Sequence, residues 1–365
     1  MRPQTTGQRA LRICLVASSR FPVGEPFMGG LEAHTHALAS ALVARGHEVC
    51  LFAAAGSDPS LGVVELPVAE FTTSAGARSD VGAMPEQWMA EHHAYLDLLL
   101  AVTRGDHGTF DVVHNNSLHH LPIAMSPILP APVVTTLHTP PLAWLESAAS
   151  FADAGARYVA VSRHTAQAWE HVVDAEVIHN GIDTTVWTQG PGGGGAMWSG
   201  RLVPEKAPHE ALAAARIAGL PLDLAGPVHD RAYFDREVLP LLDGERRYVG
   251  HLGPRELRTA LGGASVAVVT PAWEEPFGLV AAEALACGTP VAAYDRGALG
   301  EIVTGDCGRL APGGDVEALA AAMLEARALS RDAARARAES CFDHARMVDG
   351  YERTYRSMSQ LGRAA

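Results

Sequence analysis

Lysine is almost missing from this chain of 365 residues. Of its 28 Lys and Arg residues, only Lys206 is a lysine. Such a ratio is typical of GC-rich coding. Arginine replaces lysine at most surface positions at little cost, but not where a compact ammonium group is required. Lys206 is therefore a candidate functional residue, with chance survival as the alternative.

Cysteine pairs and long apolar runs are also missing. The five cysteines are scattered and form no C-x-x-C spacing, which fits a reducing cytoplasm and no structural zinc. No run of about 18 apolar residues occurs, so we expect no transmembrane helix. The apolar run near the start is short and continues directly into a first strand, so we predict no signal peptide and a cytoplasmic protein.

Positive charge is scarce, because the formal net charge is −13 at pH 7. The first 180 residues contain 9 Arg and no Lys against 17 acidic residues. This balance argues against binding to nucleic acid or to an anionic membrane surface. The chain is long enough for two domains with separate cores.

Two well-known short motifs do not occur. Residues 11–18, 31–44 and 47–55 are predicted to form a strand, a helix and a second strand. The glycines between the first strand and the helix lack the spacing G-x-G-x-x-G, and the second strand does not end in an acidic residue, so a nicotinamide dehydrogenase is disfavoured. No D-x-D motif is present, so nothing in the sequence requires a metal ion.

The most informative segment that is present is Trp273–Pro290, WEEPFGLVAAEALACGTP. It lies between predicted strands at 265–270 and 291–294 and is expected to form a loop and a helix over 277–287. In an open parallel sheet, such a loop lies at the carboxyl ends of the strands, where ligands bind. The N–H groups of Phe277, Gly278 and Leu279 would then form an anion site suited to phosphate.

The same segment carries two notable carboxylates. Glu275 precedes the predicted helix and is free to accept hydrogen bonds from hydroxyl groups. Glu283 lies within an apolar helix, where a carboxylate is costly unless it has a partner. A sugar diol is one possible partner and an arginine of the fold is another. The alternative is that Glu275 merely favours the helix dipole.

The pattern E-P-F-G-L-x-x-x-E followed by A-x-G-T-P-V resembles the donor-site signature of retaining glycosyltransferases with the GT-B fold, family 4. The resemblance implies an α/β protein with two Rossmann-like domains, whose parallel sheets face one another across a cleft. It also implies that Glu275 contacts the transferred sugar and that Glu283 holds the ribose hydroxyls of a sugar nucleotide.

The N-terminal half carries further matches to this family. Gly29–Glu32 resembles its G-G-x-E loop, whose backbone lies against the donor phosphates and which borders the acceptor; a plain helix start is the alternative. His138 ends a predicted strand and matches a T-x-H motif whose histidine contacts the transferred sugar. Glu32 and His114 are predicted acceptor contacts. For His119 and His120, an ordinary surface or hydrogen-bonded role is favoured.

The C-terminal half carries a possible diphosphate clamp. Arg201 and Lys206 have the spacing of the family's G-R-x-x-x-x-K motif, whose two cations bind the donor diphosphate; an ordinary exposed pair is the alternative. Gly226 and His251 follow predicted strands at 221–226 and 248–253, whose loops contact the base and ribose in the family.

These matches predict a division of the chain. Residues 1–187 would form the acceptor-binding domain, and 188–342 the nucleotide-sugar-binding domain. A helix at about 343–360 would pack back on the first domain. Residues 188–195 are predicted to be a flexible linker, and 56–84 an acceptor-facing loop.

The predicted activity is transfer of a sugar from a UDP- or GDP-sugar to a hydroxyl of a small polar acceptor, with retention and without a metal or other cofactor. The expected acceptor is a secondary metabolite, amino sugar or cyclitol. One alternative is a sugar-nucleotide 2-epimerase of the same fold, which needs no acceptor. Another is a non-catalytic scaffold that binds sugar nucleotides.

Overall fold

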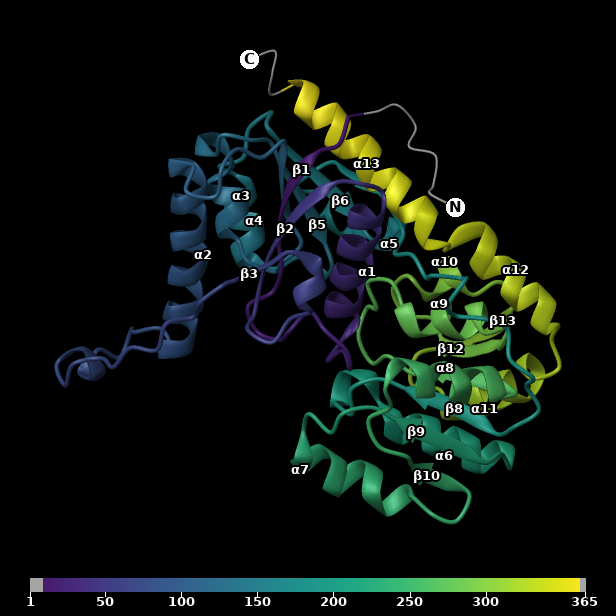
Figure 1. Cartoon of the computed structure of the whole chain (residues 1–365). Coiled ribbons are helices and arrows are strands. Elements are labelled where there is room, and N and C mark those ends of the chain that lie inside the picture. Colours follow the sequence, from purple (N-terminus) through teal and green to yellow (C-terminus); the bar gives the residue numbers. More distant parts are fainter. Residues whose placement is uncertain (1–8, 362–365) are drawn as a thin grey trace.

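The computed structural model describes residues 9–361 and contains two parallel sheets, each with its own helices (Figure 1). The N-terminal sheet has seven strands in the order β3-β2-β1-β4-β5-β6-β7. Its strands are β1 (Arg12–Val16), β2 (Glu48–Ala53), β3 (Val63–Glu65), β4 (Val112–Asn115), β5 (Val133–Leu137), β6 (Ala156–Ala160) and β7 (Ala175–Val177). The helices are α1 (Gly30–Ala44), α2 (Glu86–Arg104), α3 (Leu121–Ala124), α4 (Ala143–Ala149) and α5 (Arg163–Trp169).

The C-terminal sheet has six strands in the order β10-β9-β8-β11-β12-β13. These are β8 (Ala196–Ser199), β9 (Leu222–Ala225), β10 (Arg246–Tyr248), β11 (Val266–Val269), β12 (Val291–Tyr294) and β13 (Gly308–Ala311). The helices are α6 (Pro208–Ala218), α7 (Arg231–Tyr233), α8 (Pro254–Gly263), α9 (Leu279–Ala286), α10 (Leu299–Ile302), α11 (Val316–Ala326), α12 (Arg331–Cys341) and α13 (His344–Leu361). Two parallel sheets of this kind establish the predicted α/β architecture.

The central strands match the predictions better than the edge strands do. β12 has the predicted bounds, and all four of its residues are buried. A strand covered on both faces is a continuous apolar run, which is easy to recognise. The edge strands β3 and β7 are three residues long and only partly buried, and neither was predicted. The predicted strand at 248–253 is misplaced, because β10 ends at Tyr248.

The last helix returns to the N-terminal sheet. α13 runs along the upper right of Figure 1 and contributes Met347, Val348, Tyr351 and Tyr355 to the same core as β1 and α1. The chain passes between the domains twice, once near Ile182 and once near Phe342, and these two segments lie side by side. The Ile182 amide donates to the Phe342 carbonyl at 2.7 Å, and the Ile182 carbonyl accepts from the His344 amide at 3.0 Å.

The glycine-rich segment at 188–195 is not the flexible linker that its composition predicted. The amides of Gly190, Gly192 and Gly194 donate to the carbonyls of Cys287, Gly262 and Gly263 at 2.9–3.1 Å. A Cβ on Gly190 would lie 2.5 Å from the backbone of Gly262. Glycine is required here for close packing, and the segment is bound to the C-terminal domain along its length.

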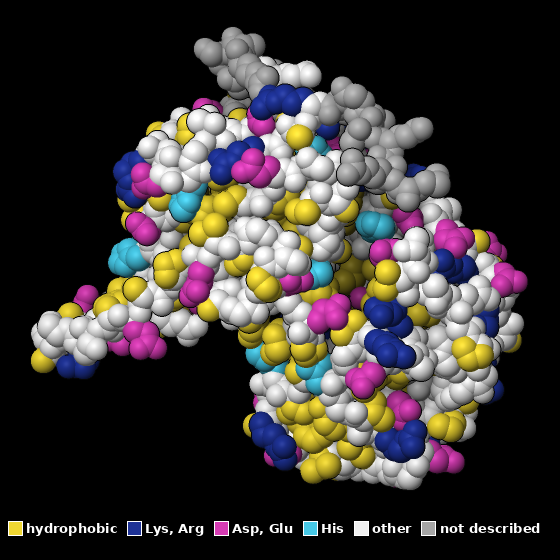
Figure 2. Space-filling model, viewed as in Figure 1, with side chains coloured by type: hydrophobic (Ala, Val, Ile, Leu, Met, Phe, Trp, Pro, Cys, Tyr) yellow, Lys and Arg dark blue, Asp and Glu magenta, His cyan; other side chains and the backbone are white. Residues whose placement is uncertain are grey.

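An arm of residues 67–85 projects from the N-terminal domain between β3 and α2, at the lower left of Figure 1. Nearly all of its residues are exposed. Figure 2 shows a deep notch between this arm and the C-terminal domain. All five cysteines lie in the described part of the chain and are free. Within residues 9–361, no helix is long and apolar enough to cross a membrane.

Candidate active site

The start of α9 differs from the prediction by two residues. The helix begins at Leu279, and Gly278 precedes it in the left-handed conformation with φ = 94°. Because Ala281 and Ala282 both donate to the Gly278 carbonyl, the helix amides left for a ligand are those of Leu279 and Val280. The amides of Phe277 and Gly278 lie before the helix. The Phe277 ring is buried in the core of the domain.

Glu275 and Lys206 form an ion pair beside this helix start. The Lys206 ammonium donates to Glu275 Oε2, and the Trp273 indole N–H donates to the same oxygen at 3.1 Å. The ammonium also lies 5.2 Å from the centre of the Trp273 ring. The Glu275 side chain is 11% exposed and that of Lys206 is 24% exposed. The only lysine of the chain therefore lies next to the first glutamate of the E-x7-E pair, although 69 residues separate them.

The two domains meet at this point. Burial raises the pKa of Glu32 on α1, and the nearby positive charge of Arg201 opposes that rise. A Cβ on Gly30 would lie 3.7 Å from the Leu279 side chain. The predicted G-G-x-E loop of the N-terminal domain thus faces both Arg201 and the start of α9.

Two polar contacts hold the domains together next to the site. Ser162 and Thr165, at the start of α5, donate to the Pro276 carbonyl at 2.6 Å and 3.1 Å. Glu301 on α10 accepts hydrogen bonds from the amides of Arg163 and His164. These contacts fix the loop that carries Glu275 against the N-terminal domain.

A chain of hydrogen bonds sets the protonation of His138. The Thr35 hydroxyl donates to the Leu31 carbonyl at 2.7 Å, so it accepts from Asn116 Nδ2 at 2.8 Å. The Asn116 carbonyl oxygen then faces His138 Nε2 at 2.7 Å, and Nε2 must donate. Burial lowers the pKa of His138 well below its ordinary value. His138 is therefore neutral at pH 7, and Nδ1 keeps its lone pair for a hydroxyl group.

The prediction that His114 contacts the acceptor is wrong. Its side chain is completely buried in β4. Nε2 lies 2.8 Å from the Thr136 hydroxyl and Nδ1 lies 2.7 Å from the Tyr355 hydroxyl of α13. Both ring nitrogens are used by the fold, so none is left for a substrate.

Gly226 and His251 lie in the loops that follow β9 and β10. The Gly226 amide donates to the Gly250 carbonyl at 2.9 Å, and its carbonyl accepts from the Tyr248 hydroxyl at 2.8 Å. Gly226 has φ = 146°, and a Cβ there would lie 1.7 Å from the Gly200 carbonyl oxygen. Glycine is required at position 226 because the backbone at Gly200, next to Arg201, leaves no room for a Cβ. His251 is exposed.

We expect Gly226→Ala to lower the free energy of unfolding by at least about 3 kcal/mol, because the clash is with backbone and cannot be relieved by a side-chain rotation. Gly219→Ala is the matched control, since Gly219 also has a positive φ of 65° but a Cβ there would have no atom within 4 Å. The control should lose only about 1–2 kcal/mol. Equal losses in denaturant unfolding would show that the close approach is not maintained in solution.

Glu283 is a buried carboxyl group without a partner among residues 9–361. It is 9% exposed, and burial raises its pKa to about 8. Within the described chain, no hydrogen bond or ion pair to its carboxyl is present. The alternative of an arginine partner is therefore not realised, and the carboxyl is available to a ligand with hydroxyl groups.

The raised pKa of Glu283 predicts a pH-dependent stability. The folded chain keeps a proton that the unfolded chain releases between about pH 4.5 and pH 8, so stability falls as pH rises through this window, by at most about 1.4 kcal/mol per unit. In Glu283→Gln this fall should be absent. Thermal unfolding between pH 5 and 8.5 measures the slope, with Glu70→Gln on the exposed arm as control. Identical slopes in wild type and Glu283→Gln would contradict the assignment.

Other residues of the site were not identified from the sequence. Asn116 and Ser162 are completely buried polar residues, but their hydrogen bonds reach distant parts of the chain. Trp273 was not predicted as a site residue, although its position two residues before Glu275 could have indicated it. Phe21 and His229, which meet across the domains with ring centres 6.2 Å apart, gave no signal.

Comparison with known proteins agrees with this geometry. Residues 28–186 match the family described as Glycosyltransferase Family 4, and residues 196–340 match Glycosyl transferases group 1. The chain is 31% identical to the glycogen synthase of Mycobacterium tuberculosis over 366 residues, which covers 86% of this chain and 85% of that protein. It belongs to glycosyltransferase family 4.

The chain is also similar to other glycosyltransferases. The phosphatidyl-myo-inositol mannosyltransferase of Mycolicibacterium smegmatis is 27% identical, over 86% of this chain and 84% of that protein. Among solved structures, a glycosyltransferase involved in avilamycin A biosynthesis has a TM-score of 0.70 at 22% identity, covering 96% of this chain and 98% of that one. Anabaena HepE in complex with UDP-glucose has a TM-score of 0.71 at 19% identity, covering 95% and 100%.

The fold of this glycosyltransferase is therefore GT-B, and the enzyme transfers sugar from a nucleotide-sugar donor. Its Arg201, Lys206, Glu275 and Glu283 belong to the C-terminal domain, and Gly30, Glu32 and His138 belong to the N-terminal domain.

Proposed function

We propose that this glycosyltransferase moves a sugar from a UDP- or GDP-sugar to a hydroxyl group of a small polar acceptor, with retention of the anomeric configuration. The observation that carries the proposal is the Lys206–Glu275 ion pair beside the start of α9, with Glu32 of the other domain near Arg201. The cations, amides and carboxyl groups gathered there support binding of a sugar diphosphate between the two domains.

The charge of the departing diphosphate would be neutralised without a metal ion. Arg201 and Lys206 supply two positive charges, and the amides of Leu279 and Val280 supply hydrogen bonds at the positive end of α9. Addition of Mg²⁺ or Mn²⁺ should therefore change the transfer rate by less than about twofold. A strict requirement for either ion would overturn this part of the proposal.

Sugar binding would use the carboxylates and His138. Glu283 would accept hydrogen bonds from the two ribose hydroxyls, which compensates the cost of its burial. Glu275 is already held by Lys206 and Trp273 and would orient hydroxyls of the transferred sugar. His138 Nδ1 would accept a hydrogen bond from another hydroxyl of that sugar.

The reaction would take place on one face of the sugar. The bond from the anomeric carbon to the phosphate oxygen breaks, and the bond to the acceptor oxygen forms on the same face. The departing phosphate takes the acceptor proton, so no protein nucleophile is required. An inverted anomeric configuration in the product, measured by NMR, would contradict this mechanism.

The acceptor would be neutral or cationic, such as an amino sugar, a cyclitol or a secondary metabolite. The N-terminal half has few cations, and Arg20, on the loop after β1, already pairs with Glu91 at 3.2 Å. An anionic lipid headgroup would find little uncompensated positive charge there. Tight binding of the protein to anionic liposomes would refute this proposal.

The decisive experiment separates donor binding from transfer. Thermal shift with UDP, GDP, ADP, dTDP and NAD, each at about 100 times its Kd, should show one diphosphate adding about 2.7 kcal/mol. Glu283→Gln should reduce that shift, because an amide has a single acceptor oxygen, whereas a carboxyl group that releases its proton on binding can accept from both hydroxyls. Stabilisation by NAD alone would overturn the proposal.

Product formation is then measured with and without an added acceptor. A transferase needs the acceptor. Conversion of the sugar nucleotide without one would identify the epimerase instead.

A further inference from the structure

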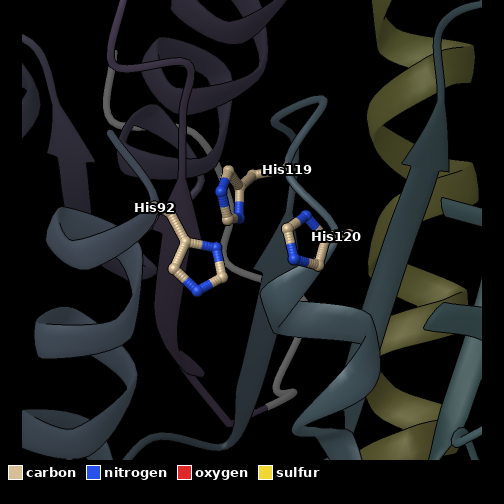
Figure 3. A group of neighbouring side chains, drawn as sticks. All are labelled: His92, His119 and His120. Atoms are coloured by element: carbon tan, nitrogen blue, oxygen red, sulfur yellow. The ribbon is translucent and has the colours of Figure 1, made fainter. Parts of the chain in front are cut away.

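Three histidines of the N-terminal domain lie together outside the donor site. His92 is on α2, and His119 and His120 are in the loop between β4 and α3 (Figure 3). One ring nitrogen from each lies within 4.8 Å of those of the other two. All three side chains are half-buried. None of them belongs to the hydrogen-bond chain of His138 or to the ion pair of Lys206.

Within residues 9–361, the rings of His92 and His120 make no hydrogen bond, and the ring of His119 makes one. Among the same residues, His92 Nδ1 is buried without a hydrogen-bond partner. His119 Nδ1 accepts from the Leu121 amide at 3.3 Å, a long contact that is cheaply exchanged.

The surroundings hold the rings close together. His119 stacks on Tyr95 with ring centres 4.1 Å apart, and Trp144 meets the edge of His120 at 4.2 Å. His119 and His120 are 4.5 Å apart and tilted by 27°. The positive charge of Arg20 also acts on His119, but it is paired with Glu91.

A set of three imidazoles selects a particular class of ion. Carboxylates and waters suit Mg²⁺ and Ca²⁺, whereas imidazole suits Zn²⁺, Ni²⁺ and Cu²⁺. We propose that His92, His119 and His120 form a binding site for one such ion, with Zn²⁺ as the expected ligand. This site is independent of the transfer reaction and of the cysteine-based zinc that the sequence argued against.

Tetrahedral zinc with nitrogens at 2.0–2.1 Å places those nitrogens about 3.3 Å apart. One nitrogen of each ring already lies within 4.8 Å of the other two, and rotation about the side-chain bonds would bring them to the distance that zinc needs. The bound ion would tie α2 to the loop after β4, and α2 begins directly after the projecting arm. The site would therefore fix the base of the arm, and its fourth coordination position would remain open.

The proposal is tested by isothermal titration calorimetry, in which ZnCl₂ is added to the untagged, chelator-treated full chain. We expect one Zn²⁺ per chain. His92→Ala and His120→Ala should each weaken binding at least about tenfold. His171→Ala is the matched control, because His171 is an exposed histidine that pairs with Glu146, and its binding should be unchanged. Equal zinc affinity in wild type and His92→Ala would overturn the proposal.

A second measurement needs no variant. Co²⁺ bound to wild type should show ligand-field absorption typical of a low-coordinate nitrogen site, and equimolar Zn²⁺ should abolish it. Absence of that absorption would also overturn the proposal. Far-UV circular dichroism of each variant shows whether a lost site reflects a lost ligand or a misfolded domain, so that only folded variants are scored.

Discussion

Lys206→Ala is expected to lower kcat/KM by at least about tenfold, which corresponds to roughly 1.4 kcal/mol of transition-state binding. Its ammonium lies between the Glu275 carboxylate and the Trp273 ring. Removal takes away a positive charge that would face the departing phosphate, and it leaves a buried carboxylate without its cation. Steady-state kinetics with the donor identified by thermal shift provide the measurement.

A second substitution distinguishes shape from charge. Lys206→Arg keeps the positive charge, but a planar guanidinium cannot occupy the place of a compact ammonium with the same contacts. We therefore expect this variant to recover only part of the activity. Full recovery would mean that the single lysine of the chain is a chance survivor.

Arg236→Ala is the control for both lysine variants, because Arg236 is an exposed cation of the same domain with a side chain 66% exposed. Its kinetics should be unchanged. Unchanged kinetics in Lys206→Ala as well would remove the lysine from the mechanism.

His138→Ala is expected to lower kcat/KM by roughly tenfold to a hundredfold. The substrate hydroxyl that pairs with Nδ1 would be left unsatisfied in a dry site, which costs about 1–3 kcal/mol. Because burial holds the pKa of His138 well below its ordinary value, this contribution should stay constant between pH 6 and pH 8. A loss of activity that follows protonation of an imidazole near pH 6.5 would contradict the neutral form.

Asn116 is expected to act through His138 as a positioning residue. Asn116→Leu removes the acceptor of the Nε2 proton, so both tautomers become populated and kcat/KM should fall. Asn116→Asp restores an acceptor for Nε2–H and should recover part of the activity. The ¹⁵N chemical shifts of the His138 ring report the tautomer directly. If these shifts are the same in wild type and Asn116→Leu, then Asn116 does not set the tautomer.

The predicted donor-side residues lie where local pattern places them, whereas one predicted acceptor-side residue does not. Arg201, Lys206, Glu275 and Glu283 lie within short motifs, and each motif is placed by one strand and the turn that follows it. The alternation of buried strands and helices then brings the turns to the same edge of one sheet. A local pattern is sufficient to predict where such residues lie, because their positions depend little on segments that are distant in the sequence.

The histidines show where this reasoning fails. His114 and His138 both lie near the carboxyl ends of neighbouring strands, and the sequence predicted a ligand contact for both. His114 is instead covered by Tyr355 of α13, which lies 241 residues later in the chain. A helix from the other end of the sequence therefore decides which histidine remains available to a ligand.

The start of α9 gives a smaller example. The sequence predicted a helix that began at residue 277, but Gly278 takes a left-handed conformation, and a Cβ there would lie 2.6 Å from the Leu299 side chain. The Pro276 carbonyl is held by Ser162 and Thr165 of the other domain. Tertiary contacts therefore overrode the local preference for an earlier start.

The sequence alone determined the α/β class, because strand burial is a local property of the chain, and its motifs resembled those of a family with two facing sheets. Only the tertiary structure decided that Lys206 pairs with Glu275, that Glu283 has no partner in the described part of the chain and that His92, His119 and His120 meet. These are contacts between segments far apart in sequence. Their existence depends on how helices and domains pack, and packing free energy is shared over many residues rather than carried by any one motif.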